Sequence, residues 1–476
     1  MESIWSKTCQ LPPRPRLEAD LRTEIAVIGA GMAGLLCAHT LAEAGHQVVV
    51  LEAGRMAGGQ TRNTTAKITS QHGMIYKKLS DSIGIAGAAA YGAAHQAAIR
   101  EYRRLVDRLG IDCDFEEQPN YVYAEDLRAL AQEAEAAKRL GLPAELVEAP
   151  KSPLPAAGAV RFSGQAQFHP LKFLRAISEP LTVYEQTQVS AVDGTTLRTS
   201  GGTVRAEKVI FACHYPFPRL PGLYFTRLHQ ERSYVLALKT DLPAEGMWIG
   251  AEGEKLSLRR WRNLLLFGGG GHRTGENRRG GQYELLRRRA GALFPDAKEV
   301  ACWSAQDCIT PDHIPFIGRY SAGKPDWYLA TGFQKWGMTG SMVSALLLTQ
   351  LLEGNRPPEA AVFDPGRSGA GIAAGLRKEG VHAAKGLGKA FFSIPKVSAK
   401  QLPPGHGGVV RMGGKKIGAY RAEDGTLYTV SVRCPHLGCQ LEWNPEEKSW
   451  DCPCHGSRFD YRGNLISGPA QSNAKK

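Results

Sequence analysis

Long hydrophobic runs are absent from this sequence of 476 residues. The longest apolar candidate spans 343–352 and is interrupted by three polar residues, Ser344, Thr349 and Gln350. A bilayer span needs roughly 18 apolar residues or more, so no transmembrane segment is expected. The first twenty residues contain neither an apolar export core nor a twin arginine. We therefore expect a cytoplasmic protein.

Motifs typical of nucleic-acid binding are also missing. The sequence has no RNP-type aromatic pattern and no zinc-finger spacing, so no nucleic-acid partner is expected. The net charge is nevertheless +13, from 59 Lys and Arg against 46 Asp and Glu. Residues 366–476 hold 17 basic and 8 acidic side chains, a surplus of +9, which leaves +4 for the first 365 residues.

This surplus is densest over 366–409, where seven basic residues stand against the single acid Glu379. Because charge runs are usually solvated faces, we expect residues 366–405 to form a basic strap that packs over the larger part of the chain. The alternatives are contact with an acidic redox partner, a membrane surface or nucleic acid, or a flexible tether. Exposing Phe391, Phe392 and Ile394 would be costly, which favours the strap.

A glycine-rich turn follows the first apolar segment. Residues 23–28 predict a short strand, and Gly29, Gly31 and Gly34 then open a helical pattern. A second strand pattern ends on the acid Glu52. The glycines permit a tight turn, the close approach of a pyrophosphate and close packing of the helix on the sheet. The N-terminus of the helix favours the binding of phosphates. Glu52 can accept hydrogen bonds from a ribose. This pattern predicts a dinucleotide site.

A second strand, glycine loop and helix occur late in the chain. Residues 327–331 predict a strand, and a loop with Gly332 and Gly337 leads into a helix that runs to Leu352. Such a helix N-terminus can stabilise negative charge on a bound ring system. Gly268 and its three following glycines lack the spacing of another fingerprint and are expected to end a strand in a tight turn. A separate NAD(P)H domain is therefore not expected.

These segments resemble the D-amino-acid oxidase-like (glycine oxidase, sarcosine oxidase) family of FAD-dependent oxidoreductases. The resemblance covers 24–367 and rests on the fingerprint, the GGQTRNTTAK loop at 58–67, the VIFACHYPF strand at 209–217, and the TPDHIPFIG and YLATGFQKWGMTGS segments at 310–341. It implies FAD contacts at Gly29, Gly31, Met32, Ala33, Gly34, Glu52, Arg55, Thr61, Thr64, Thr65, Val189, Gly332, Gly337, Met338 and Thr339.

The same likeness implies substrates with a C–H bond next to an amine, such as amino acids or N-methylated amines. Arg259 and Arg260 lie on a predicted strand, where one of them could bind a substrate carboxylate or simply form a solvated face. Asp307 and Trp336 flank the late motifs and could line the substrate side, or could cap a turn and fill the core. The catalytic residue stays unassigned.

Four of the ten cysteines fall within 21 residues near the C-terminus. Cys434 and His436, followed by Cys452 and His455, give the spacing C-x-H-x15-C-x-x-H. Two thiolates and two imidazoles from two loops can hold either zinc or an iron–sulfur cluster. The Cys-His order within each pair favours the cluster, because zinc fingers usually pair Cys with Cys.

This segment, over 406–470, resembles the disulfide-containing Rieske 2Fe–2S domain of respiratory cytochrome bc complexes. The resemblance implies that Cys434 and Cys452 bind one iron, that His436 and His455 bind the other, and that Cys439 forms a disulfide with Cys454. Phe459 replaces a tyrosine whose hydroxyl bonds a cysteine sulfur in that family. Without this donor, we expect a potential below the top of the ~−150 to +300 mV Rieske range.

Together these observations predict an α/β Rossmann-type FAD-binding domain with an inserted antiparallel-sheet α+β substrate domain, followed by an all-β Rieske domain. The expected division is 1–78, 169–222 and 305–365 for the FAD-binding domain, 79–168 and 223–304 for the substrate domain, 366–405 for the strap and 406–476 for the Rieske domain.

The expected activity is amine oxidation at FAD, with electrons passed singly through the cluster to a ferredoxin-like protein or a quinone. Three alternatives remain. Electrons could run from a ferredoxin through the cluster to FAD in a reductase or monooxygenase, or the Rieske domain could mark an oxygenase with a mononuclear iron. The chain could also be a non-catalytic redox carrier or sensor. No domain-sized region is left for the mononuclear iron site, which disfavours the oxygenase.

Overall fold

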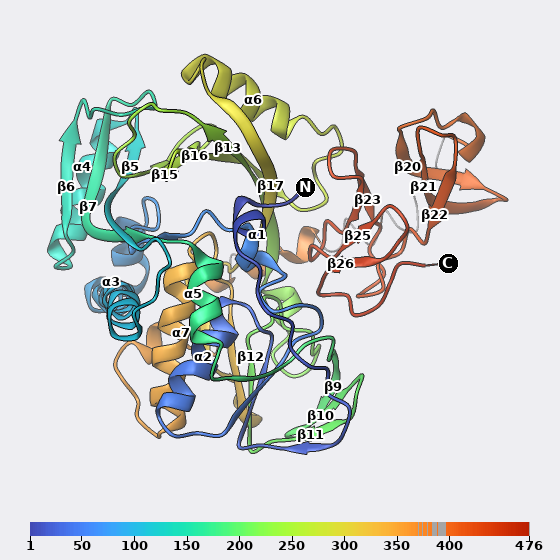
Figure 1. The fold of residues 1–476 in the computed structure, drawn as a ribbon, viewed down its shortest axis with the longest axis horizontal. Coiled ribbons are helices and arrows are strands. Elements are labelled where there is room, and N and C mark those ends of the chain that lie inside the picture. The colour runs from blue at the N-terminus through green and yellow to red at the C-terminus, as the bar shows by residue number, and fades with distance from the viewer. Residues whose placement is uncertain (370, 374, 378, 383–387, 389–396, 476) are drawn as a thin grey trace.

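The protein folds into two large sheet bodies with two small C-terminal sheets beside them (Figure 1). The structure, a computed structural model, describes residues 1–476 except 370, 374, 378, 383–387, 389–396 and 476. The three predicted aromatic and aliphatic residues of the strap, Phe391, Phe392 and Ile394, lie outside the described residues. No described helix is both long and apolar enough to cross a membrane.

The first body is a six-stranded sheet in which five neighbouring strands run parallel and β18 pairs antiparallel at one edge. Its order is β18(Phe316–Ser321), β19(Lys324–Thr331), β12(Lys208–Phe211), β2(Ile25–Ile28), β3(Val48–Leu51) and β8(Thr182–Tyr184). The helices of this body are α1(Ile4–Thr8), α2(Met32–Glu43), α5(Pro170–Ile177), α7(Gly337–Leu352) and α8(Ala360–Phe363). A small sheet of β1(Leu21–Arg22), β11(Thr203–Arg205), β10(Thr196–Thr199) and β9(Val189–Asp193) lies at its far end (Figure 1).

The second body is a nine-stranded, mostly antiparallel sheet, called the large sheet below. Its order is β17(Lys298–Ile309), β13(His229–Lys239), β16(Leu264–Arg273), β15(Ser257–Trp261), β14(Met247–Gly250), β5(Glu116–Ala124), β7(Gly158–Gln167) and β4(Lys67–Ile68), with β6(Ala144–Glu148) paired to β7. Its helices are α4(Leu127–Arg139) and α6(Gln282–Leu293). β17 pairs with β13 as far as Ile309, beyond the expected division at 304–305; the domain limits stay a prediction.

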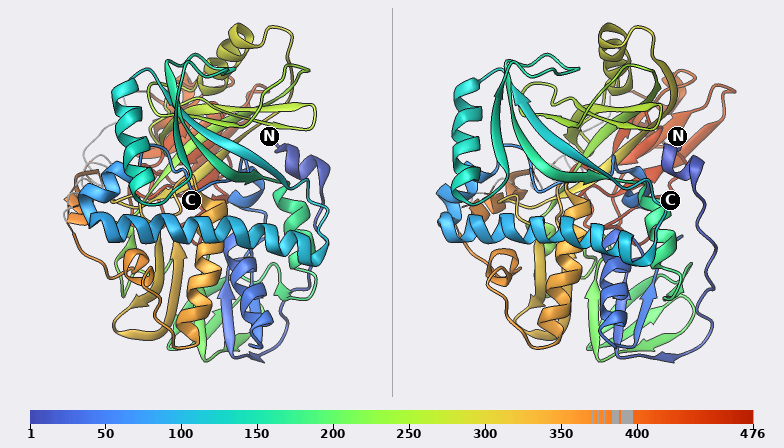
Figure 2. Two further views of the ribbon diagram at one scale, coloured as in Figure 1. Left: turned by 90° about the vertical axis from the view of Figure 1, so that its left-hand side faces the viewer. Right: turned by 60° about the vertical axis from the view of Figure 1, so that its left-hand side comes forward.

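The helix α3(Tyr76–Leu109) runs across the molecule between the two bodies (Figure 2). Gly84 has a φ of +76°, which interrupts the regular helix and produces a kink. The Tyr102 hydroxyl, buried on this helix, donates to the carbonyl of Met338 on α7 at 2.9 Å. This contact links the long helix to the N-terminal turn of α7.

The glycines 268–271 lie inside β16 and do not end a strand, so that expectation was wrong. Gly268 and Gly269 pair with Val235 and Tyr234 of β13. The register shifts between Arg232 and Tyr234, opposite a positive φ of +66° at Gly270. A bulge of this kind absorbs the left-handed glycine and lets the strand continue.

The C-terminal part contains two antiparallel sheets. One consists of β20(Gly407–Met412), β21(Lys415–Arg421) and β22(Leu427–Val430), and the other of β23(Glu442–Asn444), β24(Ser449–Asp451), β25(Arg458–Asp460) and β26(Leu465–Ser467). Short 3₁₀ helices occur at η1(Gln60–Asn63), η2(Tyr224–Thr226) and η3(Ala399–Gln401). The second small sheet lies next to β17 of the large sheet (Figure 1).

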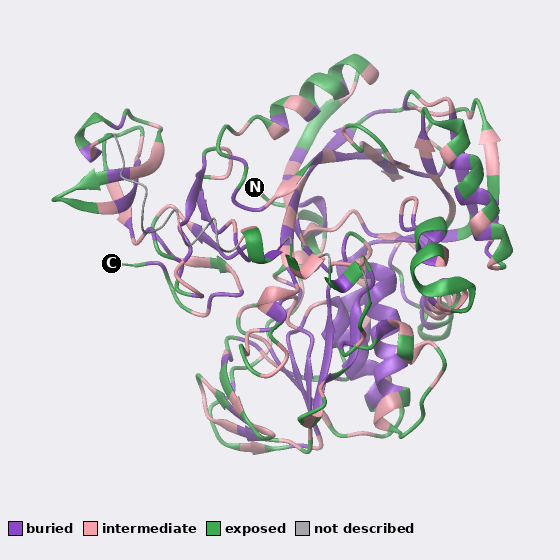
Figure 3. Ribbon diagram, turned by 180° about the vertical axis from the view of Figure 1, so that it is seen from behind, coloured by how far each residue is buried: buried purple, intermediate pink, exposed green. Residues whose placement is uncertain are grey.

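The described part of the strap packs on the first body. Ile372 is buried in the hydrophobic cluster beneath the six-stranded sheet, and Leu376 packs against that cluster. Glu379 is also buried. These three residues fall on one helical face by their spacing, which supports the strap over a free tether in this part. Figure 3 shows that buried residues concentrate in the first body, along its strands and the helices beside them.

Candidate functional site

The glycine turn between β2 and α2 is formed by the close approach of backbones. A Cβ on Gly34 would lie 1.8 Å from the Gly29 carbonyl oxygen, and a Cβ on Gly29 would lie 2.8 Å from the carbonyl oxygen of Ala212. Gly29 also has a φ of +106°. Gly31 caps α2 without a side chain, so no side chain of its own fills the space before the first-turn N–H groups. The turn therefore leaves the room and the donors that a pyrophosphate requires.

Glu52 and Thr61 lie against this turn. The Glu52 carboxylate accepts from the backbone N–H groups of Ala30 at 2.9 Å and Gly54 at 2.7 Å. Burial raises the pKa of Glu52, and these two hydrogen bonds oppose the increase. The Thr61 hydroxyl accepts from the N–H of Met32 at 3.0 Å, which brings η1 to the start of α2.

The late glycine loop brings a second helix N-terminus into the first body. Gly332 has a φ of +74°, and a Cβ there would lie 2.3 Å from Thr310 Cγ2. Trp336 caps α7 without a side-chain bond, and a Cβ on Gly337 would meet nothing within 4 Å. The Thr339 hydroxyl donates to the carbonyl of Thr69 at 3.1 Å. This contact ties α7 to the segment after η1.

The other predicted FAD contacts lie near the same two loops, except Val189, which lies on β9 of the small sheet. Arg55 pairs with Glu185 at 2.9 Å, and Val189 is buried at the start of β9. The Thr64 hydroxyl accepts from the N–H of Ala66 at 2.9 Å and fixes the end of the η1 loop. Thr65 is half-buried in that loop, and Ala33 and Met338 are buried in the first turns of α2 and α7.

The two substrate-side arginines are held by backbone carbonyls. Arg259 is fully buried and donates to the carbonyls of Ala66 at 3.2 Å and Phe168 at 3.1 Å, with its guanidinium 5.1 Å from the ring centre of Trp5. These contacts argue against a carboxylate-binding role for Arg259. Arg260 also donates to backbone carbonyls, namely those of Thr240, Leu242 and Arg262.

Asp307 and Trp336 each contact a side chain from another segment. Asp307 forms an ion pair with Lys335 at 3.1 Å. Trp336 stacks on His72 with ring centres 4.8 Å apart, and burial lowers the pKa of His72 to about 3. Trp336 is half-buried and therefore stacks on a neutral imidazole at the edge of the core.

Lys67 is a polar residue whose position the sequence pattern did not reveal. It lies on β4 of the large sheet and donates to the Ser257 hydroxyl at 2.5 Å. Burial, and then the nearby charge of Arg259, lowers the pKa of Lys67 to about 7. An amine with such a pKa can take up or release a proton near neutrality.

The four predicted cluster ligands come together at the tips of two similar loops. In each loop a backbone N–H bonds back to the first cysteine, from Gly438 to Cys434 and from Gly456 to Cys452, both at 2.9 Å. The rings of His436 and His455 have centres 4.8 Å apart and are perpendicular.

These donors fit a 2Fe–2S cluster. Nδ1 of His436 and Nδ1 of His455 are buried and have no hydrogen-bond partner among the described residues. Burial lowers the pKa of both imidazoles, to about 4 and about 3, which keeps them in the neutral form that binds metal. Cys434 and Cys452 are buried free thiols, and contact with Cys452 lowers the pKa of Cys434.

A disulfide between Cys439 and Cys454 joins the two loops, as the resemblance implied. The sulfur atoms of Cys439, Cys452 and Cys454 all lie within 4.8 Å of one another. Because the disulfide uses two of these sulfurs, Cys452 is the one of the three that stays available as a ligand. Phe459 is fully buried in the same core and brings no hydroxyl.

The cluster loops are docked against the large sheet. Glu447, from the turn between β23 and β24, pairs with Arg232 of β13 at 2.5 Å and with Arg458 of β25 at 3.0 Å. All three side chains are less than 10% exposed. Burial alone would raise the pKa of Glu447, but the two guanidinium groups outweigh it and lower this pKa to about 2.

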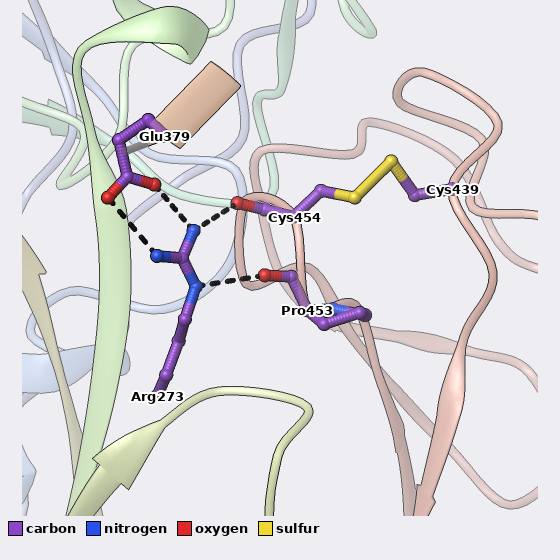
Figure 4. The surroundings of a disulfide bond; sticks show 5 residues. All are labelled: Arg273, Glu379, Cys439, Pro453 and Cys454. Carbon is purple, nitrogen blue, oxygen red and sulfur yellow. Dashed lines mark hydrogen bonds and ion pairs between the residues drawn. A yellow bond between two sulfur atoms is a disulfide. The ribbon is translucent and has the colours of Figure 1, made fainter. Parts of the chain in front are cut away.

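Arg273 joins the large sheet, the strap and the cluster loop (Figure 4). From the end of β16 it donates to the carbonyls of Pro453 and Cys454, both at 3.1 Å. The same guanidinium pairs with both carboxylate oxygens of Glu379, at 3.1 and 2.6 Å. His229 Nδ1 also lies 3.1 Å from Glu379. No sequence pattern singled out Arg273 or His229.

Comparison with known families covers both halves of the chain. Residues 24–351 match the DAO family, described as FAD dependent oxidoreductase, and residues 393–476 match the Rieske [2Fe-2S] domain. The protein YhfW of Bacillus subtilis (strain 168), whose name describes a Rieske 2Fe-2S iron-sulfur protein, is 36% identical over 490 residues, with 98% of this chain and 96% of YhfW covered.

Cytochrome b6-f complex iron-sulfur subunit 2 of Trichormus variabilis matches the C-terminal part alone. It is 47% identical over 55 residues, which cover 11% of this chain and 31% of that subunit.

Solved structures show the same fold in the larger part of the chain. Glycine oxidase from Geobacillus kaustophilus aligns with a TM-score of 0.63 and 22% identity, covering 73% of this chain and 99% of the oxidase. L-amino acid deaminase from Proteus vulgaris aligns with a TM-score of 0.61 and 16% identity, covering 75% of this chain and all of the deaminase.

The predicted fold class and cofactors are confirmed by these matches. The protein is an enzyme that binds FAD in its larger part and a 2Fe–2S cluster in its C-terminal domain. The chain belongs to the DAO family of FAD-dependent oxidoreductases and ends in a Rieske domain.

Proposed function

We propose that this enzyme oxidises a C–H bond next to an amine, in an amino acid or an N-methylated amine, and passes the electrons one at a time through the Rieske cluster to an external acceptor. A ferredoxin-like protein or a quinone would be that acceptor. The names of the structural neighbours, an oxidase and a deaminase of amino acids, support this substrate class.

When bound, FAD can accept a hydride, which carries two electrons, whereas a Rieske cluster carries one electron at a time. The chain's own residues provide the frame. In our proposal, the glycine turn at Gly29 to Gly34 and Glu52 hold the dinucleotide, while the uncapped start of α7 faces the flavin end. The contacts expected from the family resemblance complete this site.

One observation carries the proposal. The backbone carbonyls of residues 453, 454, 455 and 456, in the loop that bears two cluster ligands, all accept hydrogen bonds from side chains of the large sheet, namely Arg273, Gln230 and Gln306. A cluster loop docked on the sheet that adjoins the FAD loop is the arrangement that internal electron transfer needs. An independent carrier domain would not need such contacts.

Anaerobic stopped-flow mixing with a panel of amino acids and N-methylated amines tests this proposal. The flavin absorbance and the cluster absorbance are followed separately, and we expect the flavin to be reduced first and the cluster second. The variant Cys434→Ser serves as the control, because its flavin should still be reduced with no second phase. Reduction of the cluster before the flavin, or no reduction by any amine, would contradict the proposal.

A further inference from the structure

Two buried glutamines connect the cluster loop with the FAD-side loops. Gln230 lies on β13 and Gln306 on the neighbouring strand β17, and both side chains are at most 1% exposed. Gln306 Nε2 donates to Gln230 Oε1 at 2.5 Å, so the two amides form one hydrogen-bonded unit. We call Gln230 and Gln306 the glutamine bridge.

On one side the glutamine bridge binds the cluster loop. Gln230 Nε2 donates to the carbonyl of His455, a cluster ligand, at 2.7 Å and to the carbonyl of Gly468 at 3.1 Å. Gln306 Nε2 donates to the carbonyl of Gly456 at 2.8 Å. Gly456 leaves no free space here, because a Cβ on it would lie 2.6 Å from Gln230 Cβ.

On the other side the bridge reaches both loops of the FAD region. The backbone N–H of Gln306 donates to Gln60 Oε1 of η1 at 2.7 Å. Gln230 Oε1 lies 3.1 Å from His214 Nε2. The His214 carbonyl in turn accepts from the hydroxyl of Thr331, the residue before the late glycine loop, at 2.5 Å. Two series of hydrogen bonds, one from η1 and one from the residue before the late glycine loop, therefore meet at the cluster loop.

Glutamine suits this position because its amide donates and accepts at once without carrying charge. An apolar side chain here would leave the buried carbonyls of His455 and Gly456 without their donors, and a carboxylate would place an acceptor against them.

We propose that Gln230 and Gln306 are positioning residues that fix the cluster loop against the FAD-binding loops, so that electrons cross between the two cofactors without movement of the Rieske domain. This inference rests on the electron exchange in the proposed function. Each transfer oxidises the reduced flavin by one electron and reduces the cluster from the diferric to the mixed-valence state. Two transfers remove the two electrons of one hydride, and an external one-electron acceptor reoxidises the cluster after each.

The surrounding contacts favour a fixed domain. Withdrawal of the Rieske domain would separate Glu447 from Arg232, a pair in which both side chains are buried. The same movement would break the hydrogen bonds from Arg273 to the carbonyls of Pro453 and Cys454. Arg219 also donates to the carbonyl of His436, and the Phe225 ring centre lies 6.1 Å from that of His455. The histidine side of the cluster is therefore covered by the 219–227 segment.

The test measures internal electron transfer without any amine. A photogenerated deazaflavin radical injects one electron into the loaded full-length protein, and the flavin and cluster absorbances report how the electron redistributes. We expect a first-order rate independent of protein concentration. Gln306→Met and Gln230→Met should each slow it by about tenfold, the equivalent of ~1.4 kcal/mol, which is within the cost of an unpaired buried carbonyl.

Gln188→Met is the matched control. Gln188 also donates to a carbonyl of the Rieske domain, that of Gln471 at 3.2 Å, but this carbonyl belongs to neither loop that carries the cluster ligands. Its variant should keep the wild-type rate. Flavin content and the electron paramagnetic resonance spectrum of the reduced cluster should be retained in all loaded variants, and the unpaired carbonyls should lower the thermal midpoint of the two methionine variants by only a few degrees. If the two glutamines had a purely structural role, the thermal midpoint would fall in proportion to the rate of internal electron transfer.

Equal rates of internal electron transfer in wild type, Gln306→Met and Gln230→Met would overturn the inference. Equal slowing in Gln188→Met would also overturn it, and so would a transfer rate that rises with protein concentration. Should a methionine variant fail to load its cluster, Gln306→Asn gives the same test, because its amide ends one methylene short of the Gly456 carbonyl. The proposed amine oxidation can fail while this result stands, because the electron comes from the radical.

Discussion

The cofactor sites of the FAD region and of the Rieske domain are formed by different parts of the residues. In the FAD region, space is made by the absence of side chains, since a Cβ on Gly34 or Gly29 would collide with neighbouring backbone. In the Rieske domain, side chains supply the site, and the buried Nδ1 atoms of His436 and His455 have no hydrogen-bond partner in the part of the chain that the structure describes. The first site therefore depends on backbone shape and the second on donor chemistry.

This difference predicts which substitutions each site tolerates. Adding a methyl group should destroy the first site and leave the second loaded. Exchanging one donor atom should empty the second and leave the first intact. Arg273 and the glutamine bridge position the two sites and bind no cofactor. Substitutions at these residues should therefore leave both cofactors bound.

The largest effect is expected for Gly34→Ala. Its Cβ would lie 1.8 Å from the Gly29 carbonyl oxygen, so α2 must move away from β2. We expect loss of FAD and destabilisation by about 4 kcal/mol or more, measured by flavin absorbance and thermal unfolding. Gly291→Ala is the matched control, since it also lies in a helix but has open space around it and should stabilise by up to ~1 kcal/mol. Normal flavin content in Gly34→Ala would contradict the steric argument.

Cys434→Ser should remove the cluster and spare the flavin. A serine hydroxyl is a poor substitute for a thiolate ligand to iron. We expect the Rieske electron paramagnetic resonance signal and the bound iron to disappear while the flavin spectrum remains. Cys9→Ser, at a half-buried free cysteine in the first body, should change neither cofactor. A retained Rieske signal in Cys434→Ser would mean that the ligand set is wrong.

Glu379→Gln should weaken the docking of the Rieske domain. Glu379 pairs with Arg273, which holds the cluster loop, and both side chains are less than 10% exposed. Loss of this charge should cost about 2–3 kcal/mol, seen as a lower midpoint for thermal bleaching of the cluster. Glu135→Gln, at an exposed pair with Arg139, should change stability by less than ~0.5 kcal/mol.

The same pair predicts a pH dependence. Burial would raise the pKa of Glu379, but hydrogen bonds with His229 and Arg273 outweigh it and lower this pKa to about 2. Its stabilisation is full above the ordinary value of 4.5 and is lost as the pH falls through about 2. Burial would likewise lower the pKa of His229, yet bonds with Glu231 and Glu379 raise it above 6.5.

The contribution of His229 is therefore full below pH 6.5 and is lost as the pH rises through its raised pKa. The cluster midpoint should be highest between about pH 4.5 and 6.5, and the profile should flatten in Glu379→Gln. An unchanged profile in that variant would assign the dependence to other groups.

The smallest expected effect is on the cluster potential. Phe459→Tyr should restore a hydroxyl donor in the buried core around the cluster loops, which stabilises the reduced state. A gain of ~1.4 kcal/mol would raise the one-electron potential by about 59 mV. A redox titration followed by the cluster spectrum measures this. Phe225→Tyr, on the histidine side, is the control that should leave the potential within a few tens of millivolts. A fall in Phe459→Tyr would contradict the donor argument.

Much of this protein could be predicted from its sequence because the informative residues are close together in the chain. The turn from Gly29 to Gly34 with its strands and Glu52, and the paired boxes at Cys434 and Cys452, each lie within a few dozen residues, and their spacing reflects local geometry. The expectation for glycines 268–271 failed because a bulge depends on the partner strand β13, which local sequence does not reveal.

The substrate side shows the limit of such reasoning. Arg259 looked available on its strand, but tertiary folding places the carbonyls of Ala66 and Phe168 around it. No sequence pattern indicated the lowered pKa of the half-buried Lys67, because its desolvation and its neighbour Arg259 come from the assembled sheet.

Short-range patterns of glycine, cysteine and histidine specify both cofactor sites, so FAD and the Rieske cluster could be predicted before the fold was known. How the two sites meet depends on tertiary contacts. Gln230, Gln306 and Arg273 are ordinary polar residues on strands, and they became contacts of the cluster loop only because β13, β16 and β17 end beside it. Contacts between residues 150 or more positions apart leave no periodic trace in the sequence.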